Sequence, residues 1–141
     1  MRYAILRDFL MAFLAGREWD PMPTFVPGPG TDANALDVTP DRLVMLTFGS
    51  GAGLSVEQVF DRPIVQVRAA GNQSDYDDGE RLAYDLDRGM LSVDSSRDIG
   101  GVWVTGITRV GGNPQLLLID DADRANFTCT YAMESETGYD N

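Results

Sequence analysis

The 141-residue sequence contains no histidine and no lysine, and it has one cysteine. The absence of histidine removes the commonest general base and the commonest metal ligand, so Ser50 and Ser55 have no imidazole to activate them. The single Cys129 allows neither an intrachain disulfide nor a cysteine-based metal cluster. Its place in an alternating strand pattern predicts a small buried apolar residue. The sequence therefore gives no positive case for an enzyme, a cofactor or a metal.

Long hydrophobic runs are also missing. No stretch approaches the ~20 apolar residues that cross a bilayer, so no membrane segment is expected. Arg2 precedes an apolar run, as in a signal peptide, but Arg7 and Asp8 interrupt that run. This interruption favours an amphipathic helix of the mature protein.

Acids dominate the charged residues, with 22 Asp and Glu against 11 bases, all of them arginine, and a formal charge of -11. Such a surface disfavours electrostatic binding of nucleic acid or anionic membranes. Solubility is the simplest reason for it. The length suits one domain, expected to span residues 1–141.

Hydrophobic periodicity predicts an α+β fold: a mainly antiparallel sheet of four to five strands, with an N-terminal helix and a central helix packed on it. Proline and glycine indicate a long loop at 17–42, and the acidic end at 134–141 is expected to be flexible. Residues 54–60 fit either a helical turn or a strand end. The expected helices cover residues 1–15 and 74–90, and the expected strands cover residues 43–48, 63–70, 102–110, 115–119 and 125–133.

The most distinctive stretch is the strand-turn-helix of residues 63–90. Alternation of Val65, Val67 and Ala69 with polar residues predicts a half-buried strand. Ser74 stands where an N-cap belongs, before a first turn rich in aspartate. The polar face of the helix is expected to hold ion pairs between carboxylates and arginines three or four residues apart. Its members are Asp77, Asp78, Arg81, Asp85 and Arg88.

Two motifs suggest ligand sites, and neither satisfies the requirements. The glycines of 49–53 follow a strand, but the third comes too early for a dinucleotide turn, Pro63 limits any helix, and no GK[ST] follows. A calcium loop starting at Asp121 would need glycine at 126 and glutamate at 132, where asparagine and alanine stand. A hairpin tip and a solvated turn are the expected structures.

Three stretches carry a family resemblance: DRPIVQVRAAGNQSDYDDGERLAYDLDRGML, then GVWVTGITRVGGNPQLL, and finally DRANFTCTYAM. With the N-terminal helix, this layout resembles the tail-terminator (tail-completion) proteins of long-tailed bacteriophages over most of the chain. Other small neck proteins, such as stopper or head-completion proteins, and tail-tube proteins share much of this pattern. A small non-viral partner-binding module is the alternative from another class.

The resemblance implies a non-enzymatic virion protein of the neck region, assembled in the host cytoplasm. It would form a homo-oligomeric ring, a hexamer by analogy, that caps the tail tube and stops its polymerisation. Its partners would be copies of itself, the major tail tube protein and the stopper protein, with DNA passing through the lumen without specific binding.

Projections usually carry partner contacts, so the loop from Trp19 to Phe25, the glycine-rich tip and the acidic C-terminus are the expected interfaces. The charged helix face and Arg109 complete the set. The candidate interface residues are Trp19, Phe25, Gly49, Gly51, Gly53, Asp77, Asp78, Arg81, Asp85, Arg109, Glu134 and Glu136.

Overall fold

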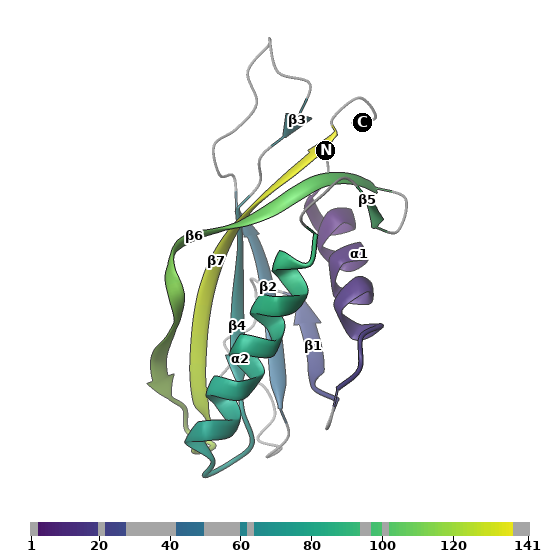
Figure 1. The fold of residues 1–141 in the computed structure, drawn as a ribbon. Coiled ribbons are helices and arrows are strands. Elements are labelled where there is room, and N and C mark those ends of the chain that lie inside the picture. The colour runs from purple at the N-terminus through teal and green to yellow at the C-terminus, as the bar shows by residue number, and fades with distance from the viewer. Residues whose placement is uncertain are drawn as a thin grey trace.

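The structure is a computed structural model that describes residues 3–19, 22–27, 42–49, 60–61, 64–93, 97–99 and 102–136. Two helices lie against one seven-stranded sheet with the order β1-β2-β4-β7-β6-β5, and β3 pairs with β7 beyond β4 (Figure 1). The elements are α1 (Tyr3–Ala15), β1 (Thr24–Pro27), β2 (Leu43–Gly49), β3 (Phe60–Asp61), β4 (Ile64–Ala70), α2 (Tyr76–Leu91), β5 (Arg97–Ile99), β6 (Val102–Ile119) and β7 (Ala125–Glu136).

The α+β class and the mainly antiparallel sheet are confirmed, because only the β1–β2 pair is parallel. Five strands have four or more residues, but they are not the five expected: β1 was not expected, and the strands expected at 102–110 and 115–119 are one strand, β6. The very short β3 and β5 raise the number to seven among the described residues. Sequence periodicity could not reveal these two, since two or three residues carry no readable alternation.

Both helices pack on the same face of the sheet, and the main core lies between them and the strands (Figure 1). The helices contribute Leu10 and Leu14 from α1 and Leu82, Leu86 and Met90 from α2, all at most 1% exposed. β2, β4 and β7 contribute alternate residues, as the two-residue period of a strand requires. The sheet side of this core includes Val44, Leu46, Val65, Val67, Ala69, Phe127, Cys129, Tyr131 and Met133.

The uninterrupted apolar run of β2 reflects burial on both faces. Val44 and Leu46 belong to the main core, whereas Leu43 and Met45 form a second cluster with Ala70 and the partly buried Val26. A strand buried on both sides needs no polar alternation. The predicted strand at 43–48 is thus confirmed.

The expected strand-turn-helix is present, with one correction at its cap. Asp75, not Ser74, is the N-cap: its carboxylate accepts the backbone N–H of Asp78 at 3.0 Å. Ser74 has a φ of 60°, a left-handed conformation that serines seldom adopt. Its hydroxyl donates instead to Asp123 Oδ2 at 2.6 Å, which joins the two loops at this end of the sheet.

The loop expected at 17–42 contains a strand that sequence reasoning missed. β1 runs parallel to β2, and the Thr24 N–H donates to the carbonyl of Arg42 at 2.9 Å. Pro23 precedes β1 and Pro27 ends it, and these prolines led to the prediction of a loop. Prolines are tolerated there because β1 is an edge strand.

A second correction concerns residues 111–114, which were expected to separate strands at 102–110 and 115–119. β6 continues through it as one strand of 18 residues, and its register against β7 shifts between Val110 and Gln115. Gly111 has a φ of +85°, which makes this irregularity easy for glycine. A further shift of register lies between Val104 and Gly106.

β7 confirms the predicted alternating strand and extends it to Glu136. β5 lies between the helix expected at 74–90 and the strand expected at 102–110. The tail expected at 134–141 is corrected in part, because residues 134–136 belong to β7. Several expectations fall outside the described residues: the glycine-rich tip at 50–53, most of segment 54–60, residues 28–41 of the loop expected at 17–42, and residues 137–141 of the tail.

Candidate interaction surfaces and buried ion pairs

Among the described residues, three aspartates are buried, and each pairs with an arginine that the sequence analysis had not assigned to it. They are Asp78 and Asp87 on α2 and Asp120 in the turn between β6 and β7. Sequence reasoning did not single out Asp87 and Asp120 as buried, and it placed Asp78 on the solvent side. A pattern of charges along one helix cannot reveal partners that another strand supplies.

Asp78 is held by Arg42, at the start of β2. Arg42 Nη2 donates to Asp78 Oδ1 at 2.6 Å, and Nε donates to Oδ2 at 3.0 Å. The side chains are only 4% and 6% exposed, and the N–H of Asn72 donates to the same carboxylate at 2.8 Å. The hydrogen bonds from Arg42 lower the pKa of Asp78, although burial opposes them. The pair ties the first turn of α2 to the sheet.

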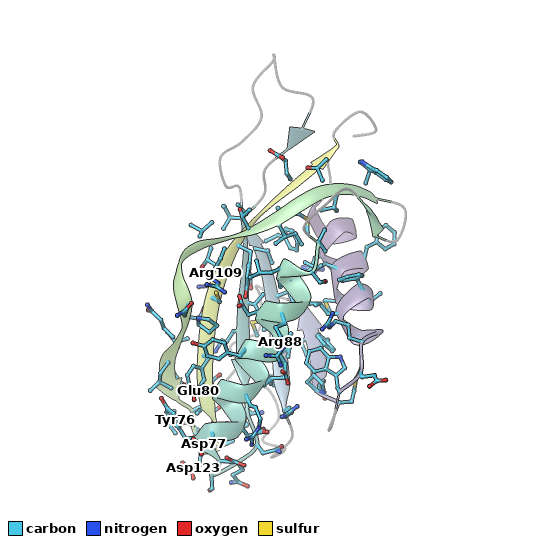
Figure 2. All side chains as sticks on the ribbon, viewed as in Figure 1. Tyr76, Asp77, Glu80, Arg88, Arg109 and Asp123 are labelled. Carbon is cyan, nitrogen blue, oxygen red and sulfur yellow. The ribbon has the colours of Figure 1, made fainter. Side chains whose placement is uncertain are left out.

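Asp87 connects the C-terminal half of α2 to two strands. Its carboxylate accepts hydrogen bonds from Arg109 on β6, at 3.0 Å from Nε, and from the Tyr131 hydroxyl on β7, at 2.7 Å. Tyr131 is fully buried, and this burial, together with neighbouring Cys129 and Asp87, raises its pKa far above the ordinary value. Arg109 also donates to Asn113 at 2.8 Å, so the candidate Arg109 supports the fold (Figure 2).

Asp120 organises the turn before β7. It accepts the Arg124 backbone N–H, Arg124 Nε and Asn126 Nδ2, each at 3.0 Å. Burial would raise the pKa of Asp120, but these hydrogen bonds and the Arg124 charge together lower it. The expected turn is present, yet Asp120 is buried within it, so only Asp121 and Asp123 fit the solvated picture.

These lowered pKa values predict loss of stability in acid. A carboxyl whose folded pKa lies below its ordinary 3.8 stabilises the protein fully above that value and loses its contribution as pH falls through the folded pKa. Urea unfolding between pH 7 and pH 2 should show a decline that begins near pH 4. An unfolding free energy that stays level down to pH 2 would contradict the assignment of Asp78 and Asp120 as ionised partners.

The aromatic candidates are not free projections. Trp19 is half-buried, its indole N–H donates to the Leu14 carbonyl at 2.9 Å, and its ring meets Phe25 edge-on at 6.0 Å. Both rings pack against the main core. Their role as interface residues remains a prediction, and their contacts in the structure attach the segment after α1 to the sheet.

The charged candidates on α2 separate into exposed and buried ones. Asp77 is exposed, Arg81 projects with its Nη2 3.9 Å from Asp78, and Asp85 pairs with Arg88 as predicted. Asp78 is buried, which corrects its expected place on the polar face. The exposed part of this face remains available to a partner.

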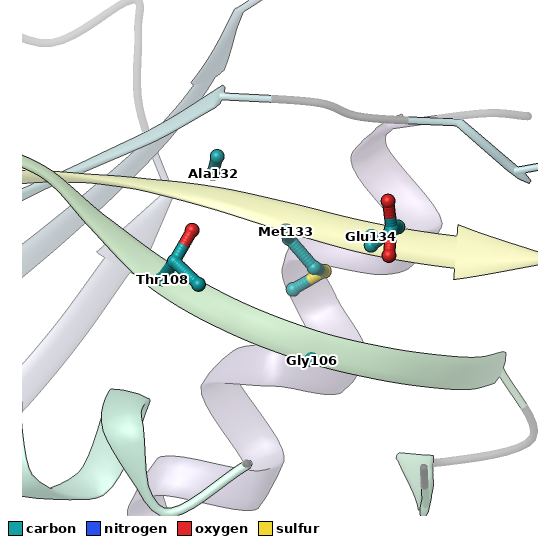
Figure 3. A pocket seen from close by; sticks show the side chains of 5 residues that line it. All are labelled: Gly106, Thr108, Ala132, Met133 and Glu134. Atoms are coloured by element: carbon teal, nitrogen blue, oxygen red, sulfur yellow. The ribbon is translucent and has the colours of Figure 1, made fainter. Parts of the chain in front are cut away.

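The remaining candidates lie on the sheet. Gly49 ends β2 opposite Ile64, and Glu136 pairs with Phe60 near the end of β7. Glu134 lines a hollow between β6 and β7 (Figure 3). Its carboxylate accepts a hydrogen bond from the Thr105 hydroxyl at 3.2 Å. Gly51 and Gly53 lie outside the described residues. The candidates therefore do not gather into one site.

An exposed apolar edge, which sequence reasoning missed, runs along β6. No strand that the structure describes pairs with the outer side of β6 from Thr108 to Ile119. We call this segment the β6 edge. Its exposed apolar side chains are Val110, Leu116, Leu117 and Ile119, each 45–51% exposed. The strand pattern at 115–119 carried the signal, since four consecutive apolar residues cannot all face one core.

Within the described ranges, neither helix is long and apolar enough to cross a membrane, and no cluster of three acidic or cysteine side chains could hold a metal ion. A comparison of the chain with protein-family models and with curated proteins found no match.

Proposed function

We propose that this protein is a structural subunit that assembles into a ring, caps the tail tube of a long-tailed bacteriophage and joins it to the neck. The β6 edge carries the proposal. A long edge strand with exposed apolar residues and unpaired backbone groups is a liability in a monomer, and natural proteins cover or charge such edges. The β6 edge has no lysine and no exposed proline, so its covering by another chain is the simplest solution.

The sheet provides a second edge for this purpose. β1 lies at the opposite end of the strand order, and Met22 beside it is 52% exposed. If the β1 edge of one copy pairs with the β6 edge of the next, the contact is head-to-tail. Head-to-tail contacts close into rings when the rotation between subunits allows it. Such a ring requires two different edges on one sheet, and among the described residues no strand pairs with the outer side of β1 or of the β6 edge.

The charge distribution suits a channel for DNA. The three buried aspartates already pair with arginines, namely Arg42, Arg109 and Arg124, whereas many carboxylates are exposed. A lumen lined by carboxylates would let DNA pass without binding it, because carboxylates cannot replace the counterions of the phosphates and so gain no free energy from their release. A mapped lumen that proved neutral or basic in the assembled ring would contradict this part of the proposal.

The mass of the purified protein tests the ring. We expect an assembly of about six subunits, from the resemblance, and a Val110→Lys, Leu117→Lys variant that remains folded but shifts to monomer, since buried unpaired charges oppose edge pairing. The measurement is size-exclusion chromatography with light scattering. Glu80→Lys on the outer face of α2 is the matched control and should leave the mass unchanged.

Tube capping needs a separate measurement. Purified assembly added to polymerising tail tube protein should shorten the tubes in electron micrographs, and the Val110→Lys, Leu117→Lys variant should not. A stable wild-type monomer that has no effect on tube length would refute the proposed function.

A further inference from the structure

A hollow lies at the end of the sheet where α2 begins, between two loops that are joined by hydrogen bonds. Ser74 and Asp123 both have left-handed backbones, with φ of 60° and 61°, and the Ser74 N–H donates to the Asp123 carbonyl at 2.7 Å. Figure 2 shows Tyr76 and Asp123 at this end of the molecule. We call it the Tyr76 hollow. It is lined by Ser74, Asp75, Tyr76, Ile119, Asp123 and Ala125.

The floor of the Tyr76 hollow is apolar and fixed. Tyr76 is 47% exposed, yet its ring stands edge-on to the buried Phe127, with the centroids 5.4 Å apart. Ile119 is 51% exposed, and Leu116 pairs with Phe127 on the adjoining part of the sheet. Large apolar side chains held open to solvent in this way mark a contact surface.

Two carboxylates of the hollow are held in place by the fold. Asp75 caps α2, and Asp123 accepts the Ser74 hydroxyl. No arginine is among the described residues that line the hollow, and neighbouring Arg124 is buried against Asp120. The hollow therefore combines an apolar floor with negative charge that has no cation within it.

From this geometry we propose that the Tyr76 hollow binds an arginine or lysine side chain of another protein. The aliphatic stem would cover Ile119 and the face of Tyr76, and the charged end would reach Asp75 and Asp123. This contact involves only the residues that line the hollow, and it leaves the backbone of the β6 edge to the contact between subunits.

The negative charge of the Tyr76 hollow indicates which kind of molecule binds there. The chain carries -11, so a second copy would bring mainly carboxylates to a negative site, as would nucleic acid with its phosphates. A basic-apolar segment of a different protein complements the hollow in both respects. The inference rests on the proposed function only for the origin of that protein, which would be the neighbouring component of the tail or neck.

The test uses two labelled peptides, acetyl-VRVRV-amide and its glutamate counterpart acetyl-VEVEV-amide. Binding is measured by fluorescence anisotropy, and the site by 15N-labelled NMR. We expect the arginine peptide alone to bind, with shifts at Ser74, Tyr76, Ile119 and Asp123. Absence of binding at the highest soluble peptide concentration, or shifts elsewhere on the surface, would overturn the proposal.

Asp75→Asn with Asp123→Asn removes the two charges and keeps the backbone, because asparagine caps helices and tolerates left-handed φ. This variant should bind the arginine peptide about tenfold more weakly at low salt. Asp8→Asn with Glu18→Gln makes the same change of net charge at two exposed positions outside the hollow and should bind as the wild type does. Equal weakening in both variants would show general attraction only and overturn the site.

The same variants are weighed by light scattering. An unchanged mass with weakened peptide binding supports a partner site separate from the ring. A change of mass in Asp75→Asn, Asp123→Asn would instead place the Tyr76 hollow at the contact between subunits and overturn the proposal. If the wild-type protein forms no ring, peptide binding can still be measured, so the proposed ring and the proposed Tyr76 site can be refuted independently.

Discussion

Replacement of Asp78 by asparagine is expected to lower the free energy of unfolding by about 3 kcal/mol. Asparagine has nearly the same shape and can still accept the N–H of Asn72, but it removes the charge that faces the buried Arg42 guanidinium. Removal of one partner of a buried ion pair is costly because the other charge stays away from water. Urea denaturation at pH 7 measures the difference.

The adjacent residue supplies the control. Asp77 lies in the same helical turn and is exposed, so Asp77→Asn should change the unfolding free energy by no more than about 0.5 kcal/mol. Equal effects of the two substitutions would show that the helix dipole, which acts on both carboxylates, and not the Arg42 pair, accounts for the stabilisation.

Gly71→Ala should have the other large effect, a loss of at least about 3 kcal/mol. An added Cβ at Gly71 would lie 2.3 Å from the backbone nitrogen of Gly79 and 2.5 Å from its Cα. Backbone atoms of a helix cannot rotate aside, so α2 would have to shift as a whole. Gly79 has no space to move away, because its own Cβ position lies 2.6 Å from the Ala125 carbonyl oxygen.

Gly112→Ala is the matched control for Gly71→Ala. The nearest atom to its added Cβ is the side-chain nitrogen of Gln115, at 3.7 Å. Thermal unfolding should therefore give a melting temperature close to that of the wild type. If the Gly71→Ala and Gly112→Ala variants had the same melting temperature, the close approach of Gly71 to Gly79 of α2 would be contradicted.

The local sequence pattern was sufficient to predict the helices and strands that bury one face. The strand around Val65 and Val67, the helix with Leu86 and Met90, and the alternating strand from Ala125 to Met133 all appear where periodicity predicted them. Their apolar spacing matches one side of a strand or helix, and that side is buried in the structure.

The sequence pattern failed where the deciding partner lies far along the chain. Asp78 is 36 residues from Arg42, Asp87 is 44 from Tyr131, and Arg68 is 58 from its acceptor Asn126. Charges three or four residues apart on one helix suggested local pairs, but the strands beneath α2 supplied stronger, buried ones. Likewise, β1 became a strand only because β2 gave it a parallel partner.

By itself, the sequence determined the α+β class, the principal helices and strands, and the absence of histidine and lysine, because composition and periodicity are local properties. The tertiary structure alone decided which carboxylates are buried, that β6 passes through its glycines as one strand, and that Tyr76, Ile119 and Asp123 share one hollow. Each of these depends on which distant segments meet, and no local pattern records that.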